Sequence, residues 1–206
     1  MNQGTLYTIS APSGAGKTSL VEALIKNTEN IQVSVSHTTR PPRPGEENGK
    51  NYHFVTENEF VHKLANHSFL EHAKVFNHYY GTSKEWLTAQ LNTGIDIILE
   101  IDWQGAQQVR RLKHDTISIF ILPPSRTVLE TRLRERGKDS DEVIAQRLHG
   151  ATLEMRYYTE CDYLVINDDF SKALKDLQSI VYSQRLKQVT QAIKCKKMLG
   201  ELLNGE

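Results

Sequence analysis

"TLYTISAPSGAGKTSLVEALI", residues 5–25, sets a glycine-rich loop between an apolar strand pattern and an apolar helix pattern. Residues 5–10 are mostly apolar or β-branched, which is typical of a strand buried on both faces of a sheet. The loop at residues 11–18 follows the pattern G-x-x-x-x-G-K-[ST], except that Ala11 stands where the first glycine would be. A strand, this loop and a helix in succession predict a phosphate-binding loop.

The chemistry of such a loop assigns a role to each part of residues 11–18. Backbone N–H groups form an anion-binding concavity, and the helix N-terminus adds positive potential. Lys17 is expected to reach the β- and γ-phosphates of a nucleotide, and Thr18 to offer its hydroxyl to Mg²⁺. The residues predicted to bind the nucleotide here are Ala11, Pro12, Ser13, Gly14, Ala15, Gly16, Lys17 and Thr18. A chance glycine-rich turn is the alternative, and the loop alone does not distinguish ATPases, GTPases and small-molecule kinases.

Strand and helix patterns alternate along much of the chain. Further strands are predicted at residues 95–99, 117–122 and 163–166, and apolar stripes at three- and four-residue spacing predict helices around 144–155 and 170–181. This alternation predicts an α/β fold with a parallel sheet. Residues 33–83 and 125–156 interrupt it and are interpreted as two insertions, the first with a helix that starts at a Thr56–Glu59 capping box.

Composition narrows the class of protein. The 206 residues carry 25 basic and 25 acidic side chains, so broad attraction to nucleic acid or to an acidic membrane is not expected. Two cysteines without paired spacing argue against a disulfide framework and favour a reducing compartment. Neither a signal peptide nor a long apolar run is visible, and we therefore expect a cytoplasmic protein.

A second anion site is predicted in the first insertion. Arg40 and Arg43 lie in a proline-rich segment, where two guanidinium groups on a stiff loop suit bidentate capture of a phosphate. Tyr52 and Tyr80 could donate hydrogen bonds to the same group. A solvated proline-rich loop is the alternative interpretation.

Two carboxylates follow the apolar strand at 95–99. The carboxyl ends of parallel strands face the ligand crevice, so Glu100 is a candidate ligand for a Mg²⁺ ion that bridges nucleotide phosphates. Asp102 is interpreted as a substrate-side residue, and the alternative, a helix N-cap for the segment that follows, does not exclude this use.

Seven segments together resemble the guanylate kinase family in its bacterial form, from about Gly4 to Gln184. They read APSGAGKTS, VSVSHTTRPPRPGE followed by NGKNYHF, FLEHAKVFNHYYGTS, ILEIDWQGAQQVR, FILPPS, RLRERG and VINDDF. The resemblance implies transfer of the γ-phosphate of ATP to GMP. It also implies a three-layer P-loop kinase fold with a five-stranded parallel core (4–32, 84–124 and 157–184), a GMP-binding insertion (33–83), a mobile helical lid (125–156) and a helical tail (185–206).

Site residues follow from the resemblance by motif position. It assigns Ser36, Arg40, Arg43, Tyr52, Glu71, Tyr80, Thr82 and Asp102 to the GMP site. Glu71 would accept hydrogen bonds from guanine, although without the family pattern an ordinary surface carboxylate is the better interpretation. Arg132, Arg136 and Arg147 would stabilise the ATP phosphates, with Lys17, and Asn167 would contact adenine. Glu100 stands where the family often has aspartate, which leaves direct or water-mediated contact with Mg²⁺ open.

Two other functions stay open at this point. A related phosphotransferase could act on another phosphorylated acceptor, and a non-catalytic guanylate-kinase-like module could bind proteins instead. The guanine-directed set argues against the first, and the presence of Lys17, Arg136 and Arg147 argues against the second. We expect ATP with Mg²⁺ as donor and GMP, with dGMP, as acceptors. Homo-oligomer formation through the C-terminal helix stays open.

Overall fold

The computed structural model describes residues 3–75, 77–135 and 140–204. A parallel sheet of five strands forms its centre, in the order β2-β7-β1-β8-β9. This confirms the predicted α/β class. The strands are β1 (Leu6–Ser10), β2 (Ile31–Val33), β7 (Asp96–Glu100), β8 (Ile117–Leu122) and β9 (Tyr163–Ile166). The short strand β2 was not predicted, because three residues are too few to show a pattern.

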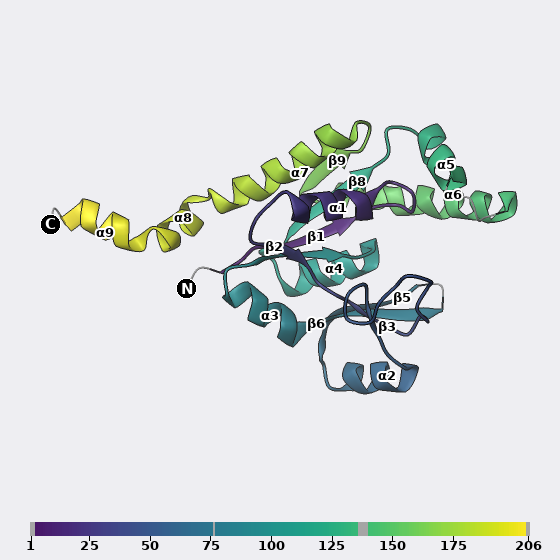
Figure 1. Cartoon of the computed structure of the whole chain (residues 1–206), viewed down its shortest axis with the longest axis horizontal. Coiled ribbons are helices and arrows are strands. Elements are labelled where there is room, and N and C mark those ends of the chain that lie inside the picture. The colour runs from purple at the N-terminus through teal and green to yellow at the C-terminus, as the bar shows by residue number, and fades with distance from the viewer. Residues whose placement is uncertain (1–2, 76, 136–139, 205–206) are drawn as a thin grey trace.

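Helices cover both faces of this sheet and make three layers (Figure 1). Buried residues of α1 (Lys17–Lys26) and α7 (Phe170–Arg185) pack on one face, and those of α3 (Lys84–Asn92) and α4 (Trp103–Leu112) on the other. Successive side chains of β1 alternate between the two layers, with Leu6 in one cluster and Tyr7 in the other. A strand buried on both sides has no polar face, which explains its apolar sequence.

A second sheet lies at the carboxyl-end side of the first, in the order β4-β3-β6-β5 (Figure 1). It consists of β3 (His37–Thr38), β4 (His53–Phe54), β5 (Phe69–Val75) and β6 (His78–Ser83), with helix α2 (Glu57–Ala65) packed against it. The predicted capping box starts α2, since the Thr56 hydroxyl accepts from Glu59 N–H at 3.2 Å and the Glu59 carboxylate accepts from Thr56 N–H at 2.7 Å. Gln108 of α4 exchanges two hydrogen bonds with the His72 backbone, at 3.1 and 2.7 Å, and ties β5 to the central layer.

Helices α5 (Arg126–Glu135) and α6 (Asp141–Met155) share a small core of their own, and the 3₁₀ helix η1 (Arg156–Glu160) leads from α6 back to β9. Leu129 and Leu133 of α5 are fully buried, and Leu148 of α6 is 8% exposed. This helical pair lies at the same end of the central sheet as the loop after β1 (Figure 1).

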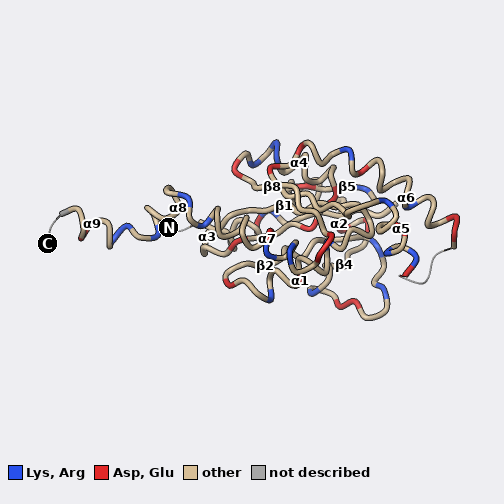
Figure 2. The backbone as a smooth tube through the Cα atoms, turned by 90° about the horizontal axis from the view of Figure 1, so that it is seen from above, with Lys and Arg blue, Asp and Glu red and all other residues tan. Residues whose placement is uncertain are grey.

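The chain ends in α8 (Gln188–Lys194) and α9 (Lys196–Asn204), which extend away from the body of the protein (Figure 1). Basic and acidic residues are interspersed along the described part of the chain (Figure 2). Among the described residues, no helix combines the length and the apolar character that a membrane crossing requires.

Candidate active site

The loop at residues 11–18 leaves β1 and turns directly into α1. Gly14 and Gly16 have φ angles of 92° and 90°, in the left-handed region that glycine adopts without steric cost. Ala15 N–H donates to Pro12 O at 3.1 Å and closes the turn. Ala11 is not among the described non-glycine residues with positive φ, so alanine fits at the strand exit.

Lys17, Thr18 and Glu100 come together where β1 and β7 end. The Lys17 ammonium donates to Ile101 O at 3.4 Å, and the Thr18 hydroxyl donates to the Glu100 carboxylate at 3.2 Å. Burial lowers the pKa of Lys17, while the nearby carboxylates of Glu100 and Asp102 act in the opposite direction. A hydroxyl and a carboxylate are hard oxygen donors of the kind that Mg²⁺ takes beside phosphates and water. The residues present therefore fit that ion.

Glu71 and Thr82 form a buried pair in the second sheet. The antiparallel register of β5 and β6 sets them opposite each other, and the Thr82 hydroxyl donates to the Glu71 carboxylate at 2.6 Å. Glu71 is only 3% exposed, and burial raises its pKa to about 7. A carboxylate in this environment is not an ordinary surface group, which removes the simpler interpretation of its sequence position.

Gly105, in the first turn of α4, faces the Glu71 carboxylate. A Cβ at residue 105 would lie 2.8 Å from Glu71 Oε2, so a larger residue here would displace the carboxylate from its present position. Asp102 caps the same helix, since its carboxylate accepts from Gly105 N–H at 2.9 Å. The predicted N-cap is confirmed. The Asp102 charge raises the pKa of both Lys17 and Glu71.

Arg40 lies against two tyrosines in the second sheet. Its guanidinium group is 5.4 Å from the Tyr52 ring centre, and the Tyr52 and Tyr80 rings are 5.9 Å apart. A hydrogen bond to Glu46 is the largest cause that raises the pKa of Arg40. The structure thus brings Arg40, Tyr52 and Tyr80 together. Arg43 is exposed and Ser36 is partly buried, and the structure does not bring either side chain into contact with these rings among the contacts described.

Glu46 belongs to this cluster and was missed by sequence reasoning. Its carboxylate accepts two hydrogen bonds from Arg40 Nη2, at 2.7 and 2.9 Å, and one from Arg43 N–H at 2.7 Å. These contacts lower the pKa of Glu46. The available signal was an acid that follows two arginines in one tight, proline-rich turn.

The arginines of α5 and α6 occupy different environments. Arg132 Nη2 donates to Asn167 O at 3.0 Å, whereas Arg134 is exposed and pairs with Glu130 and Asp141. Arg147 is partly buried in α6. Arg136 was predicted as a phosphate ligand and lies outside the described residues.

Asn167 follows β9 and reaches the loop after β1. Its side-chain Nδ2 donates to Ala15 O at 2.7 Å, and its backbone N–H donates to Leu122 O at 2.8 Å. The predicted adenine contact of this residue is untested without a nucleotide. Through these two hydrogen bonds Asn167, at the end of β9, connects the end of β8 to the loop after β1.

Two further features near the site were also missed by sequence reasoning. Burial raises the pKa of Glu154 in α6, and the Asp102 charge adds to this rise. A hydrogen bond from Ser13 N–H and the charge of Lys17 offset part of it.

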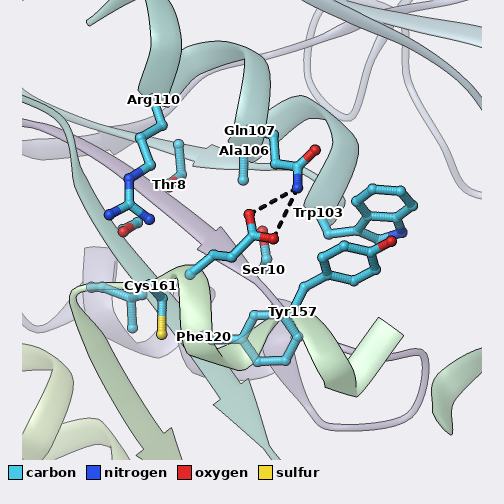
Figure 3. A pocket seen from close by; sticks show the side chains of 12 residues that line it. Thr8, Ser10, Trp103, Ala106, Gln107, Arg110, Phe120, Tyr157 and Cys161 are labelled. Carbon is cyan, nitrogen blue, oxygen red and sulfur yellow. Dashed lines mark hydrogen bonds between the residues drawn. The ribbon is translucent and has the colours of Figure 1, made fainter. Parts of the chain in front are cut away.

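The second feature joins η1 to α4. The Trp103 and Tyr157 rings stack with centres 3.8 Å apart, and Gln107 donates to the Glu160 carboxylate at 2.8 and 3.0 Å (Figure 3). These contacts fix the end of the α6–η1 segment against α4.

Comparison with known proteins identifies close relatives. Residues 3–184 match the family described as guanylate kinase. A guanylate kinase of Saccharophagus degradans is 56% identical over 201 residues, covering 98% of both chains. One of Escherichia coli K12 is 53% identical over 205 residues, covering 98% of this chain and 99% of that one. The crystal structure of guanylate kinase from Anaplasma phagocytophilum superposes with a TM-score of 0.76 at 33% identity, covering 91% of this chain and 89% of that one.

Proposed function

The chain belongs to the guanylate kinase family, and from this premise we propose how its residues transfer the γ-phosphate of ATP to GMP. The protein is an ATP:GMP phosphotransferase, a nucleoside monophosphate kinase. The observation that carries the conclusion is a buried carboxylate, Glu71, in a chain that also has a phosphate-binding loop, with the charge of Asp102 acting on the pKa of both Glu71 and Lys17.

Glu71 reads the acceptor base in this proposal. Its carboxylate accepts hydrogen bonds from guanine N1–H and the exocyclic amine, and Thr82 and Ser36 contact the rest of the base edge. Adenine has no such donor pair, so its binding would leave a buried carboxylate unpaired, which selects against it on the order of 10⁴-fold. Arg40, Arg43, Tyr52 and Tyr80 hold the GMP phosphate, and Asp102 lies at the boundary with the donor.

The loop at residues 11–18 holds the donor phosphates through its N–H groups. Lys17 neutralises charge on the β- and γ-phosphates, together with the lid residues Arg132, Arg136 and Arg147. Thr18 and Glu100 would hold Mg²⁺, which would supply positive charge to neutralise the donor phosphates. The meeting of these two side chains at 3.2 Å supports this assignment.

The transfer itself needs no general base. An oxygen of the GMP phosphate attacks the γ-phosphorus, the bond to the β,γ-bridging oxygen breaks, and ADP leaves with that oxygen. The second ionisation of a phosphate monoester lies near pH 6, so the attacking oxygen is mostly unprotonated at neutral pH. The protein aligns the two nucleotides, stabilises charge and excludes water.

The remaining expectations are proposals as well. The chain divides into a core (4–32, 84–124 and 157–184), a GMP-binding insertion (33–83), a closing lid (125–156) and a tail (185–206). dGMP is a second acceptor, the protein acts in the cytoplasm, and nucleic acid is not a partner. Exposed apolar residues of the tail, such as Leu202 and Leu203, support association of copies through α8 and α9.

One assay tests the function and its alternatives. ADP formation from ATP and Mg²⁺ is measured with GMP, dGMP, AMP, CMP and UMP in parallel. We expect turnover with GMP and dGMP alone. Equal rates with AMP and GMP would remove the guanine-reading role of Glu71 and favour a broader phosphotransferase, and no turnover with any acceptor would favour a non-catalytic module.

A further inference from the structure

We propose that Asn167 is a positioning residue that holds the phosphate loop in its anion-binding conformation. The residue is 4% exposed and lies at the end of β9, two strands away from β1. Its Nδ2 atom is engaged by Ala15 O at 2.7 Å, across 152 residues of sequence. The inference rests on the proposed ATP site and adds to it a residue behind the loop.

The hydrogen bond fixes the orientation of one peptide group. In a trans peptide, C=O and N–H point in opposite directions. Because Ala15 O faces Asn167, the N–H of Gly16, in the same peptide, points to the other side of the loop, away from Asn167. Rotation of this peptide would replace a donor by a carbonyl oxygen that repels phosphate.

Gly16 leaves the space that this contact needs. A Cβ on residue 16 would lie 2.4 Å from Asn167 Nδ2, nearer than any side chain permits. Glycine is therefore needed here for the approach of Asn167 as well as for its φ of 90°. The amide group packs directly on the loop backbone at two successive residues.

Helix α5 holds the same assembly from another side. Arg132 Nη2 donates to Asn167 O at 3.0 Å, and a Cβ on Gly14 would lie 2.9 Å from Leu129 and 3.0 Å from Leu133. Among the described residues, Asn167 Oδ1 and Arg132 Nη1 are buried without a partner.

The experiment compares ATP with inorganic tripolyphosphate, which has the phosphates and no base. Affinities for each, with Mg²⁺, are measured by calorimetry on the full chain and on Asn167→Ala. We expect both affinities to fall by the same factor, about tenfold or more, because Ala15 O is left buried and unpaired. Affinity for GMP should not change.

Matched variants separate this effect from a general loss of stability. Gln184 is also 4% exposed and donates one hydrogen bond, to the Tyr163 hydroxyl at 3.0 Å, away from the loop. Gln184→Ala should lower the melting temperature and leave both affinities unchanged. If Asn167→Ala fails to fold, the near-isosteric Asn167→Leu tests the same loss.

Three outcomes would overturn the proposal. Weaker binding of ATP with unchanged binding of tripolyphosphate would make Asn167 an adenine contact. Unchanged binding of both would leave it without either role. Failure of the unmodified protein to bind tripolyphosphate would show that the loop is not held ready for an anion. A failure of the proposed function is distinct, since the unmodified protein would then form no ADP with GMP.

Discussion

The phosphate loop is held by partners far along the chain, whereas the arginine loop at residues 36–52 is held in large part by its own neighbours. Sequence separations of 152, 84 and 82 residues connect Ala15, Lys17 and Thr18 to their partners. Arg40 and Arg43 reach Glu46 over 6 and 3 residues. The donor side is thus a product of the whole fold, and the phosphate end of the acceptor side is largely a local structure.

This difference predicts which property of the enzyme a substitution on each side will change. A change on the donor side alters contacts between core strands, so it should affect catalysis strongly. A change in the arginine loop should stay within GMP binding. Glu71 stands between these cases, because it lies in the second sheet and packs on Gly105 of the core.

The largest effect is expected from Lys17→Ala. Loss of a partly buried cation that would meet the transferring phosphate should lower kcat by about 10² to 10³-fold, the usual cost of one transition-state donor. GMP affinity, measured by calorimetry, should be retained. Lys26→Ala, at the exposed end of the same helix, is the control. Loss of GMP binding in the Lys17 variant would contradict the division into two separate sites.

Glu71→Gln should have the next largest effect. Glutamine keeps the shape but replaces one acceptor by a donor that faces guanine N1–H or the amine. We expect kcat/KM with GMP to fall by about 10 to 10²-fold, the range for a charged hydrogen bond left unmade. The KM for ATP should not change. An equal loss with both nucleotides would indicate that Glu71 supports the structure rather than the base.

A smaller effect is expected from Glu46→Ala. Arg40 would lose the carboxylate that orients it, and the KM for GMP should rise about tenfold with kcat and the KM for ATP unchanged. Glu47→Ala is the matched control, since Glu47 pairs with Lys50 in the same loop but is 64% exposed. A lower KM for GMP would show instead that Glu46 competes with the phosphate for Arg40.

The sequence predicted the residues of the donor site better than the residues that hold them in place. The loop after β1, the strand before it and Glu100 follow sequence patterns whose chemistry is known, and the Thr18 hydroxyl does donate a hydrogen bond to the Glu100 carboxylate. The contact between Asn167 and Ala15 was not foreseen, because it depends on β9 lying two strands from β1, which no local pattern encodes. The same holds for the stack of Trp103 on Tyr157.

On the acceptor side, residue types were predictable and their environment was not. The pattern indicated Arg40 and Tyr52, but burial of Glu71 depends on the absent side chain of Gly105 and on the ties between Gln108 and His72. Glu46 was not predicted as a site residue because an acidic side chain in a polar turn usually faces solvent. Its role follows only from the geometry of Arg40.

The pH dependence of GMP binding should give the smallest effect and sharpen the comparison most. Burial raises the pKa of Glu71 to about 7, so the free protein is largely protonated there at pH 6. Guanine needs the ionised form, and affinity should therefore rise by about fivefold between pH 6 and pH 7 and level off above about pH 8. Glu71→Gln should abolish this rise and retain only the titration of the GMP phosphate. ATP affinity should not follow the same curve.

The same ionisation has the opposite sign for folding. Because the pKa is higher in the folded chain than the 4.5 of the free side chain, the protonated form is the one that folding favours. Its stabilising contribution is complete below about pH 4.5 and is lost as pH rises through about 7. Near neutral pH the unliganded protein therefore carries a destabilised carboxylate that guanine can satisfy. Melting temperatures with and without GMP should diverge across this range in the unmodified protein, and a parallel shift in Glu71→Gln would assign the divergence to another group.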